Sequence, residues 1–186
     1  FDVQTPTLSA SFRVPDLGHP DVPALDLLAS IRGMGELSRI YQKLFYKTSL
    51  VTEASGGLYV PKEPGMIYFQ FETAEMEKLP VATEALFKEL RRIQDEGPTA
   101  EELARVLVNS ESDRLYATQS VDGMAGRIGF LRFIMGDLDF DRQYLDELRA
   151  VTADRIREVA AQYFDPRRMS LVLMVPKAQD KYDVEA

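Results

Sequence analysis

The sequence predicts an α+β fold, a two-layer sandwich in which an antiparallel or mixed sheet carries helices on one face. Strand-like segments stand at the start, middle and end of the chain, and helical periodicity fills the stretches between them. The regular strand-helix alternation of a doubly wound parallel sheet is missing. With 186 residues, 45% of them hydrophobic, the chain suits one domain with a substantial core. We expect this domain over residues 1–176, followed by a polar tail or linker over residues 177–186.

Period-two alternation and β-prone runs predict strands over residues 8–14, 50–60, 66–71 and 169–175. Gly56 and Gly57 interrupt the second of these, so we expect a bend or bulge there. The segment PKEPG reads as the hairpin connection to the third strand. The last segment is a mostly apolar run, Met169 to Val175, which is typical of a central strand.

Helical periodicity predicts helices over residues 21–33, 37–48, 77–95, 103–118, 120–133, 139–148 and 152–163. Thr99 and Glu102 form a capping box between two of them. Three glycines in the segment 120–133, at positions 123, 126 and 129, allow close packing or a break. The third helix carries the clearest apolar stripe, formed by Leu79, Ala82, Leu86, Leu90 and Ile93.

Composition excludes several classes of function. The net charge is −8 and no dense Lys/Arg run interrupts it, so we expect no nucleic-acid partner. The absence of cysteine excludes disulfides, thiolate metal sites and a thiol nucleophile. No apolar run reaches the roughly 20 residues that span a bilayer. The start FDVQTPT has neither an initiator Met nor a signal-peptide core, so we expect a piece of a longer protein.

The inventory of reactive side chains gives no complete active site. His19 is the single histidine, whereas a zinc helix of the His-x-x-Glu-His type needs two. A Ser-His-Asp site would have to use the same residue, and no Gly-x-Ser-x-Gly motif is present; we therefore expect a solvated turn histidine. Asp137, Asp139 and Asp141 resemble the opening of a calcium loop, but the glycine and the closing glutamate are missing. We interpret them as a loop and helix cap.

Five segments, in order, resemble the second, non-zinc domain of pitrilysin/insulinase-type zinc peptidases: GHPDVPALDLLASI, GELSRIYQKLFYKTSLVTEASGG, PKEPGMIYFQFET, DEGPTAEELARV and VTADRIREVAAQYFDPRRMSLVLMVP. The resemblance covers residues 8–176. It implies the metallopeptidase half-unit fold shared with LuxS and the mitochondrial processing peptidase. It also implies that such half-domains pair, within one chain or between subunits, to close a chamber around an unfolded peptide. Zinc is expected in an upstream domain, with no cofactor in this part.

In many members of that family, a later repeat supplies an Arg and a Tyr seven residues apart, which contact the substrate carbonyl or the oxyanion. The matching positions of this sequence hold Phe45 and Thr52, neither of which can replace those groups. The resemblance therefore implies no catalytic and no metal-binding residue in this chain, with Phe45 and Thr52 as candidates for substrate contact. It implies a non-catalytic chamber wall in a zinc metalloendopeptidase that degrades or processes unfolded peptides.

Two alternatives stay open. The parent could be a catalytically degenerate relative that serves as a structural or assembly subunit, since the Arg/Tyr pair is absent. The chain could instead be an unrelated peptide-binding module that adds a peptide to an edge strand, for which residues 66–71 are the candidate. The resemblance and the lack of cysteine favour a bacterial periplasmic setting slightly over a cytoplasmic one.

Overall fold

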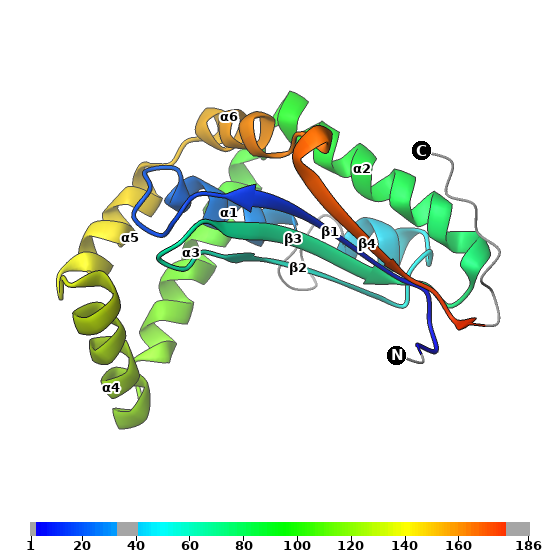
Figure 1. Cartoon of the computed structure of the whole chain (residues 1–186). Coiled ribbons are helices and arrows are strands. Elements are labelled where there is room, and N and C mark those ends of the chain that lie inside the picture. Colours follow the sequence, from blue (N-terminus) through cyan, green and yellow to red (C-terminus); the bar gives the residue numbers. More distant parts are fainter. Residues whose placement is uncertain (1–2, 33–40, 178–186) are drawn as a thin grey trace.

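Four strands form one antiparallel sheet in the order β2-β3-β1-β4 (Figure 1). The computed structural model describes residues 3–32 and 41–177. Its strands are β1 (Thr7–Val14), β2 (Glu53–Tyr59), β3 (Gly65–Glu72) and β4 (Met169–Met174). The expected α+β architecture with an antiparallel sheet is confirmed. The expected tail is not tested, because all of it after Lys177 lies outside the described residues.

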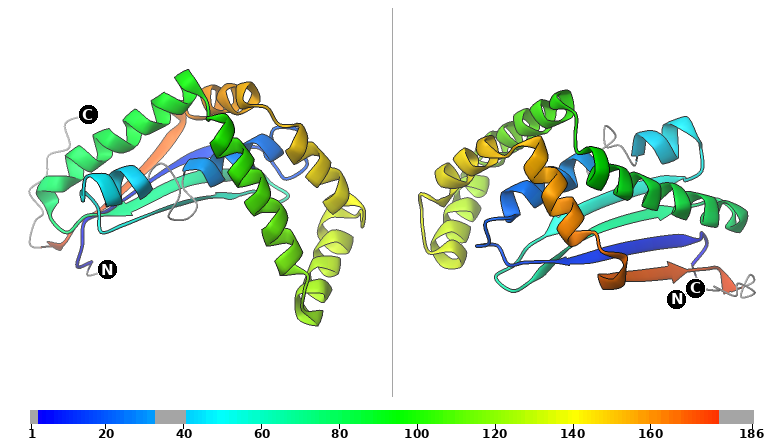
Figure 2. Two further views of the ribbon diagram at one scale, coloured as in Figure 1. Left: turned by 180° about the vertical axis from the view of Figure 1, so that it is seen from behind. Right: turned by 90° about the horizontal axis from the view of Figure 1, so that it is seen from above.

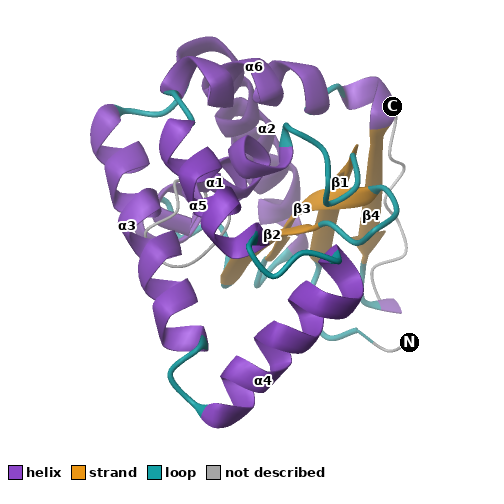
Figure 3. Cartoon of the chain, turned by 90° about the vertical axis from the view of Figure 1, so that its left-hand side faces the viewer, coloured by secondary structure: helices purple, strands orange, loops and turns teal. Residues whose placement is uncertain are grey.

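The helices gather on one side of this sheet, as the two views of Figure 2 and the side view of Figure 3 show. They are α1 (Val22–Arg32), α2 (Leu79–Glu96), α3 (Ala100–Ala117), α4 (Val121–Phe130), α5 (Phe140–Ala150) and α6 (Ala153–Tyr163). π-Helical turns cover Tyr41–Lys47 and Leu131–Met135, and 3₁₀ turns cover Met76–Lys78 and Pro166–Arg168. α4 projects away from the body of the molecule (Figure 1). Within the described residues, no helix has both the length and the apolar character needed to cross a bilayer.

The core lies between the sheet and its helices, as the alternation in β1 requires. Leu8, Ala10, Phe12 and Val14 are all buried toward the helices, whereas Arg13 on the opposite face is exposed. Side chains alternate between the two faces of a strand, so this one-sided burial follows from the period of two. α1 is enclosed by β2, α3, α5 and α6, and its leucines are buried around most of its circumference.

The strongest helix predictions are confirmed. All five residues of the predicted stripe on α2 are buried. At the start of α3 the Thr99 hydroxyl accepts from the Glu102 backbone N–H at 3.2 Å, and the Thr99 backbone N–H donates to the Glu102 carboxylate at 2.8 Å. This is the reciprocal capping box that the sequence indicates. Gly97 ends α2 with a φ of 70°, a left-handed conformation that favours glycine.

Of the bend or bulge expected at Gly56 and Gly57, the bulge is wrong. β2 continues through both glycines, and each of its residues from Glu53 to Tyr59 pairs in register with β3. Gly57 lies opposite Tyr68, and a Cβ at Gly57 would approach the Tyr68 hydroxyl to 3.0 Å. The glycine therefore accommodates a neighbouring aromatic ring rather than a bulge. Residues 50–52, also expected in this strand, precede it as an irregular segment.

Two predictions about strand position are also wrong. The apolar strand β4 stands at an edge of the sheet rather than at its centre, and β3 is internal, flanked by β2 and β1. Residues 66–71 therefore present no free edge to a peptide. An apolar run shows that a strand avoids charge, but it does not show how many neighbours the strand has. The order of the strands depends on long-range pairing.

The glycines of α4 have different roles. A Cβ at Gly123 would meet the Ala117 carbonyl oxygen at 2.1 Å, so the connection between α3 and α4 needs glycine there. A Cβ at Gly126 or Gly129 would meet nothing within 4 Å. The expectation of close packing is therefore confirmed only at the first of the three positions.

Candidate functional site

Three aromatic rings gather on the π-helical turn Tyr41–Lys47. The Tyr41 and Phe45 rings are stacked with centroids 4.9 Å apart, and Tyr46 meets both rings edge-on at 5.6 and 5.3 Å. Tyr41 and Phe45 pack against the core, whereas Tyr46 is 56% exposed. We call these three residues the aromatic turn. It places the first of the two predicted contact positions on an apolar, partly exposed surface.

The chain then reverses into β2 through a hydrogen-bonded turn. The Leu50 backbone N–H donates to the Leu44 carbonyl at 3.0 Å, and Ser49 has a φ of 49° in the left-handed region. Thr52, the second predicted contact position, is exposed and sits directly before β2. Both its backbone N–H and its hydroxyl donate to the Glu72 carbonyl, at 2.8 and 3.3 Å. The hydroxyl of Thr52 is thus engaged with the end of β3.

Leu44 and Lys43 fix the aromatic turn to the helix layer. Leu44 is fully buried, and Lys43 forms an ion pair with Glu89 of α2. The Glu89 side chain is 1% exposed, whereas that of Lys43 is 39% exposed. Because a carboxylate so deeply buried needs a cationic partner, the pair holds the turn against α2. Residues 33–40 lie outside the described part of the chain, including residues 37–40 of the predicted helix 37–48.

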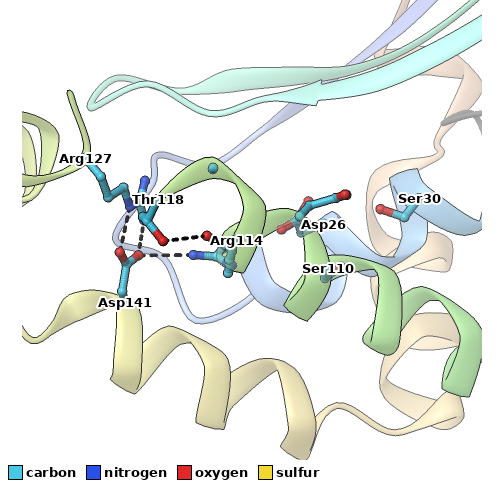
Figure 4. A pocket seen from close by; sticks show the side chains of 9 residues that line it. Asp26, Ser30, Ser110, Arg114, Thr118, Arg127 and Asp141 are labelled. Carbon is cyan, nitrogen blue, oxygen red and sulfur yellow. Dashed lines mark hydrogen bonds and ion pairs between the residues drawn. The ribbon is translucent and has the colours of Figure 1, made fainter. Parts of the chain in front are cut away.

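A second site is a charged cleft of about 320 Å³ between α1, α3, α4 and α5 (Figure 4). Asp141 of α5 lines this cleft and accepts from Arg127 of α4, through Nε at 2.7 Å, and from Arg114 of α3 at 3.1 Å. A further contact joins the Arg127 Nη2 to the same carboxylate. The Arg114 guanidinium also lies 4.5 Å above the Tyr144 ring. These contacts hold the projecting α4 to α3 and α5.

The ionisation of the cleft follows from its contacts. The hydrogen bond from Arg127 holds the pKa of Asp141 below its usual range. Asp26 of α1 accepts from the Tyr144 hydroxyl at 3.0 Å, yet burial raises the pKa of this carboxyl above its ordinary value. Burial likewise raises the pKa of Tyr144, and the neighbouring Asp26 carboxylate raises it further. The surroundings of Asp141 therefore stabilise its ionised form. Those of Asp26 instead disfavour the ionised form of this carboxyl.

His19 lies in a turn, with its side chain 40% exposed. The Asp21 backbone N–H donates to the His19 Nδ1 at 3.1 Å, which commits this nitrogen as an acceptor. The buried carboxylate of Asp21 accepts from the Tyr163 hydroxyl at 2.6 Å and from Arg155, both in α6. The polar contacts of this turn therefore tie the start of α1 to α6.

The residues that the structure describes do not fit a zinc ion. The sequence contains one histidine and no cysteine, and Asp21, with a carboxylate oxygen 3.7 Å from the His19 Nδ1, is occupied by Arg155 and Tyr163. Across residues 3–32 and 41–177, no three His, Cys, Asp or Glu side chains group as metal ligands. Asp137 of the acidic cluster instead accepts from the Asp139 backbone N–H at 2.9 Å.

Sequence reasoning found part of these two sites. The i, i+4 spacing of Tyr41 and Phe45 on a helix could have indicated an aromatic pair, but Phe45 entered only through the family resemblance. The sequence pattern alone places Asp141 in a loop and helix cap. Its arginine partners stand 14 and 27 residues away, too far for a local pattern to reveal.

A family model described as the peptidase M16 inactive domain matches residues 1–108, more than half of the chain. A zinc protease PqqE from Helicobacter pylori is 27% identical over 177 residues, and the match covers 91% of this chain and 38% of that protein. This chain thus spans well under half of the relative's length.

The fold also occurs in solved structures. A protease from Helicobacter pylori superimposes with a TM-score of 0.84 at 21% identity, over 94% of this chain and 42% of that one. A peptidase M16 inactive domain from Pseudomonas fluorescens gives 0.83 at 18% identity, over 95% and 42%. The fold predicted from the resemblance is therefore confirmed, as is the expectation of a non-catalytic domain. From the matching family model, the chain belongs to the peptidase M16 inactive-domain family.

Proposed function

We propose that this chain forms a non-catalytic wall of the peptide chamber of a zinc metalloendopeptidase that degrades or processes unfolded peptides. The zinc would be held by a homologous half-domain, in the same polypeptide or in a partner subunit, where it supplies an activated water. The proposal is supported by the family and by the name of the H. pylori relative, a zinc protease. The residues of this chain would contact peptide and partner, and would move no proton.

The aromatic turn is the observation that carries this proposal. In the family, the position of Phe45 can hold a guanidinium; here it holds a ring stacked on Tyr41 at 4.9 Å. A phenyl ring offers no hydrogen bond to a developing oxyanion, but it buries apolar surface of a bound peptide. Tyr46, 56% exposed beside it, extends the same surface. The turn is suited to holding peptide side chains.

Thr52 contributes differently. Its hydroxyl donates to the Glu72 carbonyl at 3.3 Å, and its side chain is too short to replace a phenol that reaches a substrate. As a contact candidate, Thr52 would touch the peptide only with its exposed face. We expect Thr52→Ala to leave peptide turnover within about twofold of the unchanged chain, a difference of about 0.4 kcal/mol.

Reconstitution tests the proposal. A purified homologous zinc-binding half from the same organism is assayed on a fluorogenic unfolded peptide, with and without this chain. We expect no cleavage by this chain alone and a rise in kcat/KM on mixing. Phe45→Ala and Tyr46→Ala should raise KM, whereas Val108→Ala, at an exposed apolar position of α3, serves as the matched control. A zinc half that is equally active without this chain would refute the chamber-wall function.

The same assay separates the alternative, a domain of a catalytically degenerate structural or assembly subunit. The absence of a guanidinium and a phenol at positions 45 and 52 favours it. In that case the two halves would form a stable complex on a sizing column, yet the complex would cleave no peptide. The complex and the activity are therefore measured on the same fractions.

A further inference from the structure

The two edges of the sheet differ in how they are protected. β2 begins with the exposed Glu53 and contains Gly56 and Gly57, and charge and glycine both discourage pairing with another chain. β4 reads MSLVLM, without charge, glycine or proline, and pairs with β1 through an unbroken register. Natural edge strands are usually blunted by charge, proline or a bulge. Among the described residues, β4 has none of these.

The side chains of β4 are exposed on both faces of the sheet. Val172 is opposite Ser9 on the open face and is 54% exposed. Leu171 is opposite the fully buried Ala10, so it points to the helix side, yet it is 46% exposed. A helix-side leucine would be buried if the helix layer extended over it. The layer therefore stops short of β4 and leaves an apolar strip beside α2.

At the start of β4, this strip deepens into a cavity of about 200 Å³. Its walls are mostly apolar and include Phe12 of β1, Phe87 of α2, Phe164 and Met169. The cavity lies on the helix side of the sheet, next to the edge where an added strand would run. An added strand could thus place an apolar side chain in it, in addition to its main-chain hydrogen bonds to β4.

We propose that β4 pairs antiparallel with β4 of a second copy of this chain, which joins two four-stranded sheets into one of eight strands. A two-fold axis normal to the sheet keeps both helix layers on the same side. Pairing centred on Leu171 places this residue opposite its own counterpart. Leu173 of the second copy then lies opposite Met169, at the cavity lined by the phenylalanines.

The shape of the strip and the absence of charged residues in β4 favour a second copy over an unrelated strand. The occupant must be uncharged and extended, with bulky apolar residues on the helix side, and β4 has Leu171 and Leu173 at those positions. Each copy carries a net charge of −8, which disfavours contact between identical surfaces in general. The six uncharged residues of β4 avoid this repulsion at the sheet edge. The inference does not depend on the proposed function.

Sedimentation velocity of the 186-residue chain over a dilution series tests the pairing. We expect a reversible dimer that Leu171→Lys weakens by about tenfold or more, since a lysine on an edge opposes its own counterpart. Val108→Lys is the matched control, because Val108 is 61% exposed on α3, and it should leave the dimer constant unchanged. Circular dichroism verifies that both variants fold. A chain that stays monomeric at every concentration overturns the proposal.

Cross-linking gives a second readout, because the chain has no cysteine. Opposed residues of antiparallel strands lie about 4.5–5.5 Å apart at Cα, within the range of a disulfide. Leu171→Cys should therefore form a covalent dimer on mild oxidation, whereas Val108→Cys should not. A dimer that forms equally through both positions, or that Leu171→Lys leaves intact, overturns the β4 interface. The proposal is also overturned if a synthetic MSLVLM peptide binds to the chain while the chain itself stays monomeric.

Discussion

The Tyr144 hydroxyl donates a 3.0 Å hydrogen bond to the Asp26 carboxylate and so joins α5 to α1 across 118 residues of sequence. Burial nevertheless raises the pKa of Asp26, and the hydrogen bond and Arg114 offset this only in part. A raised pKa means that the folded chain holds this proton more tightly than the unfolded chain does. The contribution of Asp26 to stability therefore falls as the pH rises from the ordinary carboxyl range through the raised pKa.

Replacing Asp26 by Asn removes that charge and keeps an oxygen acceptor for Tyr144. We expect Asp26→Asn to raise the free energy of unfolding at pH 7 by up to about 1 kcal/mol, with a smaller gain at pH 4. Tyr144→Phe should instead cost about 1 kcal/mol at pH 7, because it removes the donor. Urea denaturation at the two pH values measures both. A gain for Asp26→Asn that is larger at pH 4 than at pH 7 would contradict the argument.

Asp141 should behave in the opposite way. Arg127 and Arg114 hold its pKa below the usual range, so its stabilising effect is present above the ordinary carboxyl pKa and is lost as the pH falls through the lowered value. Asp141→Asn should cost about 1–2 kcal/mol at pH 7. Hydrogen exchange should show α4 opening faster in this variant. The control is Asp146→Asn, which changes an exposed residue of α5, the helix that carries Asp141. It should leave α4 unaffected.

The glycines of α4 provide a matched pair of substitutions. Gly123→Ala would place a Cβ 2.1 Å from the Ala117 carbonyl oxygen, so the connection between α3 and α4 must shift. We expect a loss of about 1–3 kcal/mol. Gly126→Ala meets nothing within 4 Å and should stabilise α4 by about 0.5–1 kcal/mol through helix propensity. Thermal unfolding distinguishes the two. Equal effects at both positions would show that the close approach is unimportant.

The capping box of α3 gives a test that involves one helix end. Thr99→Ala removes the acceptor for the Glu102 backbone N–H, which lies 3.2 Å away. The expected cost is about 1 kcal/mol. Thr99→Ser keeps the hydroxyl and should retain most of the stability. If the serine variant lost as much as the alanine variant, the hydroxyl would not be the stabilising group.

Local chemistry made some elements predictable. The stripe on α2 and the Thr99 box depend on residues three or four apart, and both are confirmed. The π-helical turn Tyr41–Lys47 was not predictable, because Leu44 faces the core in either kind of helix. The edge position of β4 was also missed, since an apolar run fits a strand with one neighbour as well as a strand with two. The charged cleft depends on contacts between distant segments.

The pairing of β1 with β4 has a consequence for how the chain is made. Thr7 of β1 pairs with Met174 of β4, so the sheet joins residues from both ends of the described sequence. Such a distant contact forms only after a large loop has closed. On the ribosome, this edge of β1 must stay open until residues 169–174 have emerged. During that time its uncharged segment from Thr7 to Phe12 is an unpaired strand edge, the kind of surface through which incomplete chains aggregate.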